Sequence, residues 1–246
     1  MSEDVRVESK PVLGVRHAVL AYAAPRALYS RVEDTGAYGW ALVTLLALMM
    51  LIGYAQVQTG LIDTTVERKK EQQLAEIEKN EGELKDRVAL KERLDSVHKQ
   101  AEFTKMIARL GSIVAAPLSM LASFLLIASI LYAIVALAGR KPEYHTLMSI
   151  CVYAGFIELL GAVVGLAMML HYRTIEVNTS LGMLAPLGKP SVLGAVDPFR
   201  IWFWVLVAIG LTVTRQLSRR MAIASCVAMG LAAFGVRAAM EFAFAE

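Results

Sequence analysis

Three long stretches of this chain contain no charged side chain. Asp, Glu, Lys and Arg are all absent from residues 35–62, 110–139 and 221–236. A run of about 18 or more apolar residues with few charges is long enough to cross a bilayer. These absences exclude a single soluble domain. Together with an apolar content of 57% over 246 residues, they indicate an integral membrane protein.

Residue types that build metal centres, disulfides and common catalytic sites are scarce. The two cysteines, Cys151 and Cys226, both lie in apolar segments, where a thiol behaves as a small hydrophobic side chain. The four histidines lie in separate regions, and no Cys/His spacing suits a metal; they are His17, His98, His145 and His171. No phosphate-binding loop and no G-x-S-x-G motif occurs. We therefore expect neither a cofactor nor an enzyme.

The net positive charge of the chain is small. A net charge of +3 without a basic stripe argues against nucleic-acid binding. The first 36 residues are interrupted by charge too often to form the apolar core of a cleavable signal peptide. The segment from Trp40 onward is expected both to target and to anchor the chain.

Five segments qualify as transmembrane helices by length and composition. They lie at about 38–58, 112–138, 146–170, 199–216 and 221–243. The expected fold class is all-α, a polytopic membrane protein in which residues 38–246 form a five-helix membrane domain. Residues 1–37 are expected to form a cytoplasmic tail with a short interfacial helix.

The fourth segment is short for a membrane span. Its uncharged part runs only from Ile201 to Thr214. It reaches across if aromatic side chains such as Trp202 lie in one interface and Arg215 extends into the other.

The distribution of Lys and Arg in the short loops predicts the orientation. Ten of them fall on one side, in the N-terminal tail, at Arg140–Lys141 and at residues 215–220. The other side has only Arg173 and Lys189, with Arg200 at its edge. We expect a multi-pass protein of the cell membrane with a cytoplasmic N-terminus and an extracytoplasmic C-terminus.

A charged insert at 59–111 separates the first two predicted spans. Residues 63–109 hold eleven acidic and eleven basic residues, half of all the acid in the chain. Good helix formers dominate, and pairs such as Glu81–Lys85 have favourable i,i+4 spacing. A bend at Asn80-Glu81-Gly82 would return both ends to one membrane face. The insert is predicted to be an extracytoplasmic helical hairpin.

The seam of this hairpin would be apolar, formed by Leu74, Ile77, Leu84, Val88, Leu94 and Val97. Two interpretations remain open. The hairpin is either a solvated spacer or an arm that docks a partner protein.

Glu158 and Arg237 are charges that fall away from the ends of predicted spans. Glu158 lies near the middle of the third span and Arg237 in the fifth. A charge at this depth costs about 2.5–3.5 kcal/mol on insertion scales, so each needs a partner. We predict a Glu158–Arg237 ion pair, which serves either as a structural clasp or as part of a proton or substrate path.

Small residues share the helix faces of both charges. Ala154, Gly161 and Gly165 lie on the face of Glu158, and Gly230 and Ala233 on the face of Arg237. Small residues at this spacing allow close helix packing in membranes. Both charges are therefore expected to point into helix contacts, away from lipid.

The C-terminal half resembles a known family. The similarity lies in Asn178-Thr-Ser-Leu-Gly, Val196-Asp197-Pro-Phe-Arg-Ile201-Trp202, Val207-Ala-Ile-Gly210-Leu and Gln216-Leu-Ser218-Arg-Arg-Met-Ala222. Gly139-Arg-Lys-Pro-Glu-Tyr144 and, more weakly, Pro25–Val32 add to it. These segments resemble the bacterial branch of the Yip family, membrane proteins that interact with Rab GTPases in eukaryotes.

The resemblance covers about residues 25–240 and implies five spans with a cytoplasmic N-terminus. It singles out Asp197, Phe199, Trp202, Gly210 and Ser218, although Asp197 before Pro198 also fits a helix N-cap. The family's Asp-Leu-Tyr-Gly-Pro signature is replaced by Ile130-Leu131-Tyr132-Ala133, which favours a prokaryotic member over a Rab binder.

Two functions follow from these features. The first is a non-enzymatic scaffold or accessory protein that binds other membrane proteins; the resemblance adds an ABC-type export system as a partner and leaves homo-oligomers open. The second is a small transporter or channel-like permease that uses Glu158 and Arg237. A transporter requires a polar path through the bundle, whereas a scaffold is sealed by small-residue packing.

Overall fold

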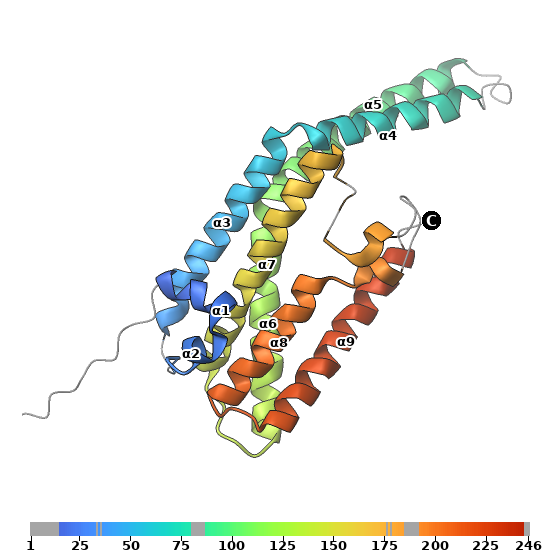
Figure 1. Cartoon of the computed structure of the whole chain (residues 1–246). Helices are drawn as coiled ribbons and strands as arrows, with labels where there is room; N and C mark the ends of the chain where they lie inside the picture. The colour runs from blue at the N-terminus through green and yellow to red at the C-terminus, as the bar shows by residue number, and fades with distance from the viewer. Residues whose placement is uncertain are drawn as a thin grey trace, which may run out of the picture.

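The computed structural model describes residues 15–32, 34, 36–79, 87–175, 177, 179–184 and 192–243, and these residues are helical or irregular (Figure 1). The α-helices are α1 (Leu20–Ala23), α2 (Pro25–Tyr29), α3 (Gly39–Gln58), α4 (Leu61–Lys79), α5 (Arg87–Leu110), α6 (Ala116–Leu137), α7 (Tyr144–Tyr172), α8 (Pro198–Val213) and α9 (Arg219–Ala243). Short segments η1 (Val15–Val19), η2 (Gly36–Tyr38), η5 (Leu181–Leu184) and η6 (Val192–Ala195) are 3-10 helices, and η4 (Gly111–Ala115) is a π-helix.

Four helices are long and apolar enough to cross a membrane: Gly36–Gln58, Leu94–Leu137, Tyr144–Tyr172 and Arg219–Met240. The apolar helix Pro198–Val213 is shorter. The helices α3, α6, α7, α8 and α9 begin and end within four residues of the predicted segments. The all-α class and the long apolar helices are thereby confirmed.

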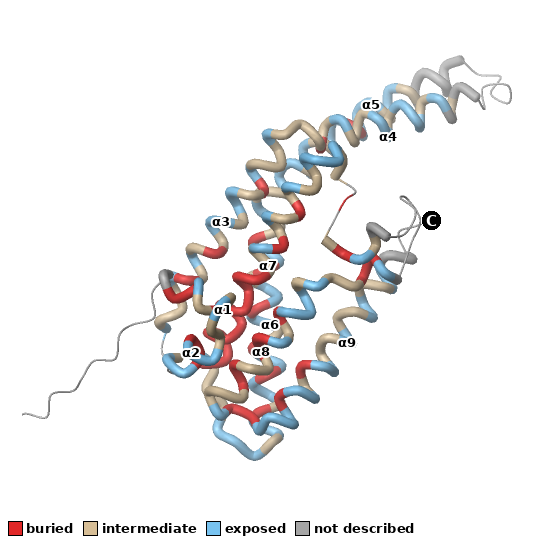
Figure 2. The backbone as a smooth tube through the Cα atoms, in the orientation of Figure 1, coloured by how far each residue is buried: buried red, intermediate tan, exposed pale blue. Residues whose placement is uncertain are grey.

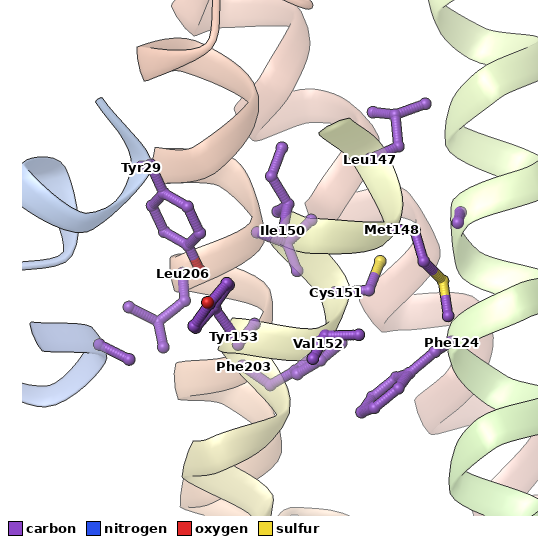
Figure 3. Close-up of a cluster of buried hydrophobic side chains, with 14 of the residues drawn as sticks. Tyr29, Phe124, Leu147, Met148, Ile150, Cys151, Val152, Tyr153, Phe203 and Leu206 are labelled. Carbon is purple, nitrogen blue, oxygen red and sulfur yellow. The ribbon is translucent and has the colours of Figure 1, made fainter. Parts of the chain in front are cut away.

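Helix α7 forms the centre of the bundle, packed against α3, α6 and α8 (Figure 1). Every residue from Thr146 to Ile157 is buried, and Figure 2 shows this turn-by-turn burial as a continuous red stretch. Around it gather large side chains from other helices, including Tyr29, Phe124 and Leu206 (Figure 3). Because this half of α7 is buried on all sides, its sequence has no continuous polar face.

Three connections meet at one end of the bundle. Arg140 Nη1 donates to the carbonyl oxygen of Arg215 at 2.6 Å, and Gln216 Nε2 donates to Glu143 Oε2 at 3.0 Å. Asp34 Oδ1 accepts from the backbone N–H of His145 at 3.1 Å. The α6–α7 connection, the α8–α9 connection and the segment before α3 therefore lie at the same end.

The first helices pack onto this end of the bundle. The Tyr22 hydroxyl donates to the carbonyl oxygen of Phe156 at 2.5 Å. Leu28 and Tyr29 are buried, and α2 contacts α8. The residues before the first span thus form α1 and α2, which are part of the folded core.

Helices α5 and α6 form one continuous helix through η4. We expected the insert to end at 111 and a new span to begin at 112. The helical backbone instead runs without a break from Arg87 to Leu137. Pro117 lacks a backbone N–H and cannot continue the regular hydrogen bonding of an α-helix. The π-helical turn lies directly before it, which is where the irregular hydrogen bonding is accommodated.

Helix α3 crosses this π-helical turn at Gly53. A Cβ atom on Gly53 would lie 1.9 Å from the carbonyl oxygen of Ser112. Only a residue without a side chain allows the two backbones to come so close. Gly53 therefore fixes where α3 and η4 pack.

Helices α4 and α5 lie side by side and project from the bundle (Figure 1). We call this pair the arm. Arg109 Nη2 contacts Asp63 Oδ2 at 2.5 Å, and Lys105 Nζ donates to Glu67 Oε1 at 2.6 Å. Hydrogen bonds from Lys105 and then Lys70 lower the pKa of Glu67 to about 2. Charge pairs thus join the two helices where they leave the bundle.

The predicted apolar seam of the arm is partly visible. Leu74, Ile77, Leu94 and Val97 are half-buried. The side chains of Leu84 and Val88, and the predicted bend at Asn80-Glu81-Gly82, lie outside the described residues.

Candidate functional site

The start of α8 places two charged residues, Asp197 and Arg200, next to the middle of α7. Asp197 precedes the helix, and its Oδ1 accepts from the backbone N–H of Phe199 at 2.9 Å. Its other oxygen, Oδ2, accepts from the Thr179 hydroxyl at 3.1 Å. The N-cap interpretation of Asp197 is confirmed. This cap, followed by Pro198, fixes where α8 begins and hence where the side chain of Arg200 lies.

Glu158 pairs with Arg200. The distance from Arg200 Nε to Glu158 Oε1 is 3.5 Å. The pairing of Glu158 with Arg237, which the sequence predicts, stays a prediction, because Arg237 lines the same cavity while Arg200 is the nearer cation. Arg237 lies 18 residues beyond the start of α9, whereas Glu158 lies 14 residues beyond the start of α7, which places Arg237 about 6 Å further along. Helix α8 packs against both α7 and α9 and supplies the closer cation.

Arg237 lines the same cavity as this pair. The cavity has a volume of about 320 Å³ and is bordered by α3, α6, α7, α8 and, through Arg237, α9. Glu158, Asp197, Arg200 and Arg237 all line it. Two carboxylates thus face two guanidinium groups, so the four charges balance inside the bundle.

Uncharged polar groups complete the lining. Ser119 and Ser123 donate to carbonyl oxygens of their own helix, at 2.8 and 2.7 Å. Gln56 Nε2 lies 3.4 Å from the Met169 sulfur, a weak acceptor. These groups keep acceptor capacity toward the cavity. Within the described residues, the cavity therefore combines these polar and charged groups with apolar side chains such as Met49 and Met120.

Of the predicted small residues on α7, Gly161 lies at a close contact and Gly165 at ordinary van der Waals distance. A Cβ on Gly161 would lie 2.9 Å from the Phe199 ring, and one on Gly165 would lie 3.7 Å from Thr179 Cγ2. Ala154 is fully buried. The face of α7 that carries Glu158 thus packs against the start of α8 and the segment before it.

On α9, a Cβ on Gly230 would lie 3.3 Å from Trp204 Cδ1. Ala233 lines a groove between α8 and α9. Both residues therefore face α8.

The remaining resemblance positions have separate structural roles. A Cβ on Gly210 would lie 2.7 Å from Ile150, so this glycine allows α8 to approach α7. The Ser218 hydroxyl accepts from the backbone N–H of Met221 at 3.5 Å at the start of α9. Trp202 is exposed and lies outside the cavity lining. These positions do not form a single site.

The sequence had placed Arg200 at the edge of the membrane as an orientation marker only. One sequence signal could have identified the role of Arg200. This residue lies in the first turn after the Asp-Pro helix cap, and this cap fixes the direction of its side chain. In the described part of the chain, no group of three or more His, Cys, Asp or Glu residues is arranged to bind a metal.

A comparison with family models gives one match, described as the Yip1 domain, over residues 20–240. The match covers most of the chain and confirms the resemblance seen in the sequence. No curated protein and no solved structure matches the chain.

Proposed function

The chain belongs to the Yip1 domain family, whose members are generally non-enzymatic multi-pass membrane proteins, and from this premise we propose that it is a membrane scaffold or accessory protein. Its role is to bind other membrane proteins through the bundle and the arm. The resemblance to bacterial members makes an ABC-type export system one candidate partner and a second copy of the chain another.

One observation carries this proposal: the base of the arm exposes apolar side chains. Phe103 is 61% exposed, and Met106, Ile107 and Leu110 are exposed too. A solvated spacer would present polar residues there, whereas contiguous exposed apolar surface is typical of interaction sites. The observation favours a docking arm over a spacer.

The proposal includes a topology. Five spans, with α8 as the short fourth one, place the N-terminus in the cytoplasm and the arm on the opposite side as a helical hairpin. The excess of Lys and Arg in the tail and in the two connections at the same end supports this orientation.

The docking role is tested with photo-crosslinking residues in the intact chain. Crosslinkers at Phe103 and Met106 should give products with specific membrane proteins. A crosslinker at Lys141, exposed at the other end of the bundle, serves as the matched control. The substitution Phe103→Ser should abolish the product of a crosslinker at Met106 without lowering the amount of protein in the membrane. Equal products from all three positions would contradict a docking arm.

A transporter is the second candidate because of the polar cavity around Glu158. Balanced charges and hydroxyl groups within the bundle are what a solute or proton path requires. Purified protein in liposomes would then change proton or solute flux, and Glu158→Gln would lower that flux while Glu71→Gln on the arm would not. Flux unaffected by the protein would remove this candidate and leave the scaffold.

A further inference from the structure

Helices α8 and α9 enclose a long apolar groove that the cavity at Glu158 does not account for. Its volume is about 970 Å³. Its walls include Ile209 and Val213 from α8, and Ile223, Val227 and Leu231 from α9. Several of these side chains are exposed: Val227 by 54% and Leu231 by 65%. Little of α9 is buried within the chain.

The groove is long enough to hold a lipid acyl chain. It extends along α8 from Asp197 to Val213. A helix of 16 residues is about 24 Å long, which exceeds one leaflet of a hydrocarbon core about 30 Å thick. An acyl chain that enters from one leaflet therefore remains in contact with the groove over its full length.

The two ends of the groove differ in charge. At the α2 end, Arg26 and Arg219 line it, and no described acidic residue does. At the other end, Arg200 and Arg237 lie near Asp197 and Glu158, so their charge is balanced. A negatively charged group is therefore favoured at the end formed by Arg26 and Arg219.

A second copy of the chain fits this groove poorly. Its least buried long helices are α9, α3 and α6. Helices α3 and α6 lie within stretches free of Asp and Glu, and the acid of α9, Glu241, is at the end opposite Arg219, so none has a carboxylate to place against Arg26 and Arg219. Burying two unpaired guanidinium groups under such a helix is costly. A free phosphate pairs with the arginines but leaves the apolar walls uncovered. A phospholipid satisfies both requirements.

We propose that the α8–α9 groove binds an anionic phospholipid from the leaflet on the N-terminal side of the protein. The phosphate lies between Arg26 and Arg219, and an acyl chain lies along Trp204, Val227 and Leu231. This lipid would be bound specifically and would exchange with the bulk bilayer more slowly than other lipids, because side chains of α2 and α9 hold its headgroup.

Trp204 provides a reporter because its side chain lines the groove. Trp40 and Trp202 are both exposed, so Trp40→Phe and Trp202→Phe leave Trp204 as the single tryptophan of the full chain. The protein is reconstituted in phosphatidylcholine with increasing fractions of phosphatidylglycerol that carries bromine on its acyl chains. We expect quenching of Trp204 at lower fractions than with brominated phosphatidylcholine.

Neighbouring arginines supply the control. Arg219→Ala and Arg26→Ala should each weaken the apparent affinity for phosphatidylglycerol about tenfold, as expected for the loss of a hydrogen bond to a charged group. Arg220→Ala removes the same charge next to Arg219 but outside the groove lining, and should leave the affinity unchanged. An equal loss in Arg219→Ala and Arg220→Ala would reduce the effect to general surface attraction and overturn the proposal. Equal quenching by both lipids, or no quenching because a second copy covers the groove, would overturn it too.

Discussion

Among the glycines that the structure describes, Gly53 has the least space for a side chain. Its α-carbon faces the carbonyl oxygen of Ser112, which a Cβ would meet at 1.9 Å. We expect Gly53→Ala to destabilise the protein by about 1–3 kcal/mol or more, because both atoms that must separate belong to helical backbones. Thermal unfolding in detergent measures this effect.

Gly235→Ala is the matched control for this substitution. Gly235 also lies in a long helix, α9, but a Cβ there has nothing within 4 Å. It should be neutral or stabilising, since Ala favours helix over Gly by about 1 kcal/mol. Equal losses in both variants would mean that the approach of α3 to η4 is not limiting.

Two tyrosines near the same end of the bundle should respond differently to loss of the hydroxyl. Tyr22 Oη donates to the Phe156 carbonyl oxygen, whereas the buried Tyr29 Oη has no hydrogen-bond partner within the described residues. We expect Tyr22→Phe to cost about 1 kcal/mol and Tyr29→Phe to cost nothing or to stabilise. Unfolding midpoints of the two variants check this, and a larger loss for Tyr29→Phe would reveal a partner for its hydroxyl.

The cavity charges allow a test of which arginine Glu158 depends on. Double-mutant cycles combine Glu158→Gln with Arg200→Gln or with Arg237→Gln and measure thermal stability. We expect a coupling of about 0.5–1 kcal/mol for Arg200, which lies 3.5 Å away and is partly exposed. The coupling for Arg237 should be smaller. A larger coupling for Arg237 would restore the pair that the sequence suggested.

At the scale of elements, the base of the arm should respond to acid. The pKa of Glu67 falls from 4.5 to about 2 through its hydrogen bonds with Lys105 and Lys70. A lowered folded-state pKa stabilises the pair fully above pH 4.5 and loses this contribution as the pH falls toward 2. The protection factors of α4 amides, which are corrected for the intrinsic pH dependence of hydrogen exchange, should therefore fall as the pH decreases between these values.

Variants separate this effect from general acid unfolding. Glu67→Gln should remove much of this fall in protection because the titrating carboxyl is gone. Glu71→Gln, also on α4 but without an ion pair among the described residues, should retain it. The same acid response in all three proteins would show that Glu67 does not hold the arm.

Hydropathy predicted the elements because each apolar helix is bounded by charges or turns that can be located in one dimension. The continuity of α5 and α6 could not be found this way, since charge ends at Arg109 while the helix does not. Where a continuous helix passes from water into lipid, its residues change from charged to apolar. In a hydropathy profile this change looks like the boundary between two elements. Pro117 strengthened that false boundary, although a π-helical turn accommodates it.

The candidate site was predictable in part for a related reason. A charge in a membrane helix is conspicuous, so Glu158 and Arg237 were found, and Gly161 on the face of Glu158 is at a close contact. Arg200 was missed because a cation near the end of a short span is usually an interface residue. Only the capped start of α8 directs it inward, and that is a matter of three-dimensional packing.

At the scale of the whole molecule, topology can be measured with little engineering. Cys151 and Cys226 are buried, so the wild-type protein should react slowly with a membrane-impermeant maleimide. A cysteine at Lys141 or Arg215 should be labelled only from the cytoplasmic side. A cysteine at Gln73 on the arm or at Leu181 before α8 should be labelled only from outside. Labelling of Lys141 and Gln73 positions from one side would contradict the five-span topology.

The unbroken helix from the arm into the bundle has a mechanical consequence. The apolar part and its extension, Leu94–Leu137, comprise 44 residues, about 66 Å of rigid rod. No loop separates the arm from α6, so a partner that pulls or twists the arm applies torque directly to a membrane helix. Its fulcrum is the point where Gly53 touches the π-helical turn. The arm is thus one end of a lever whose other end lies inside the bilayer.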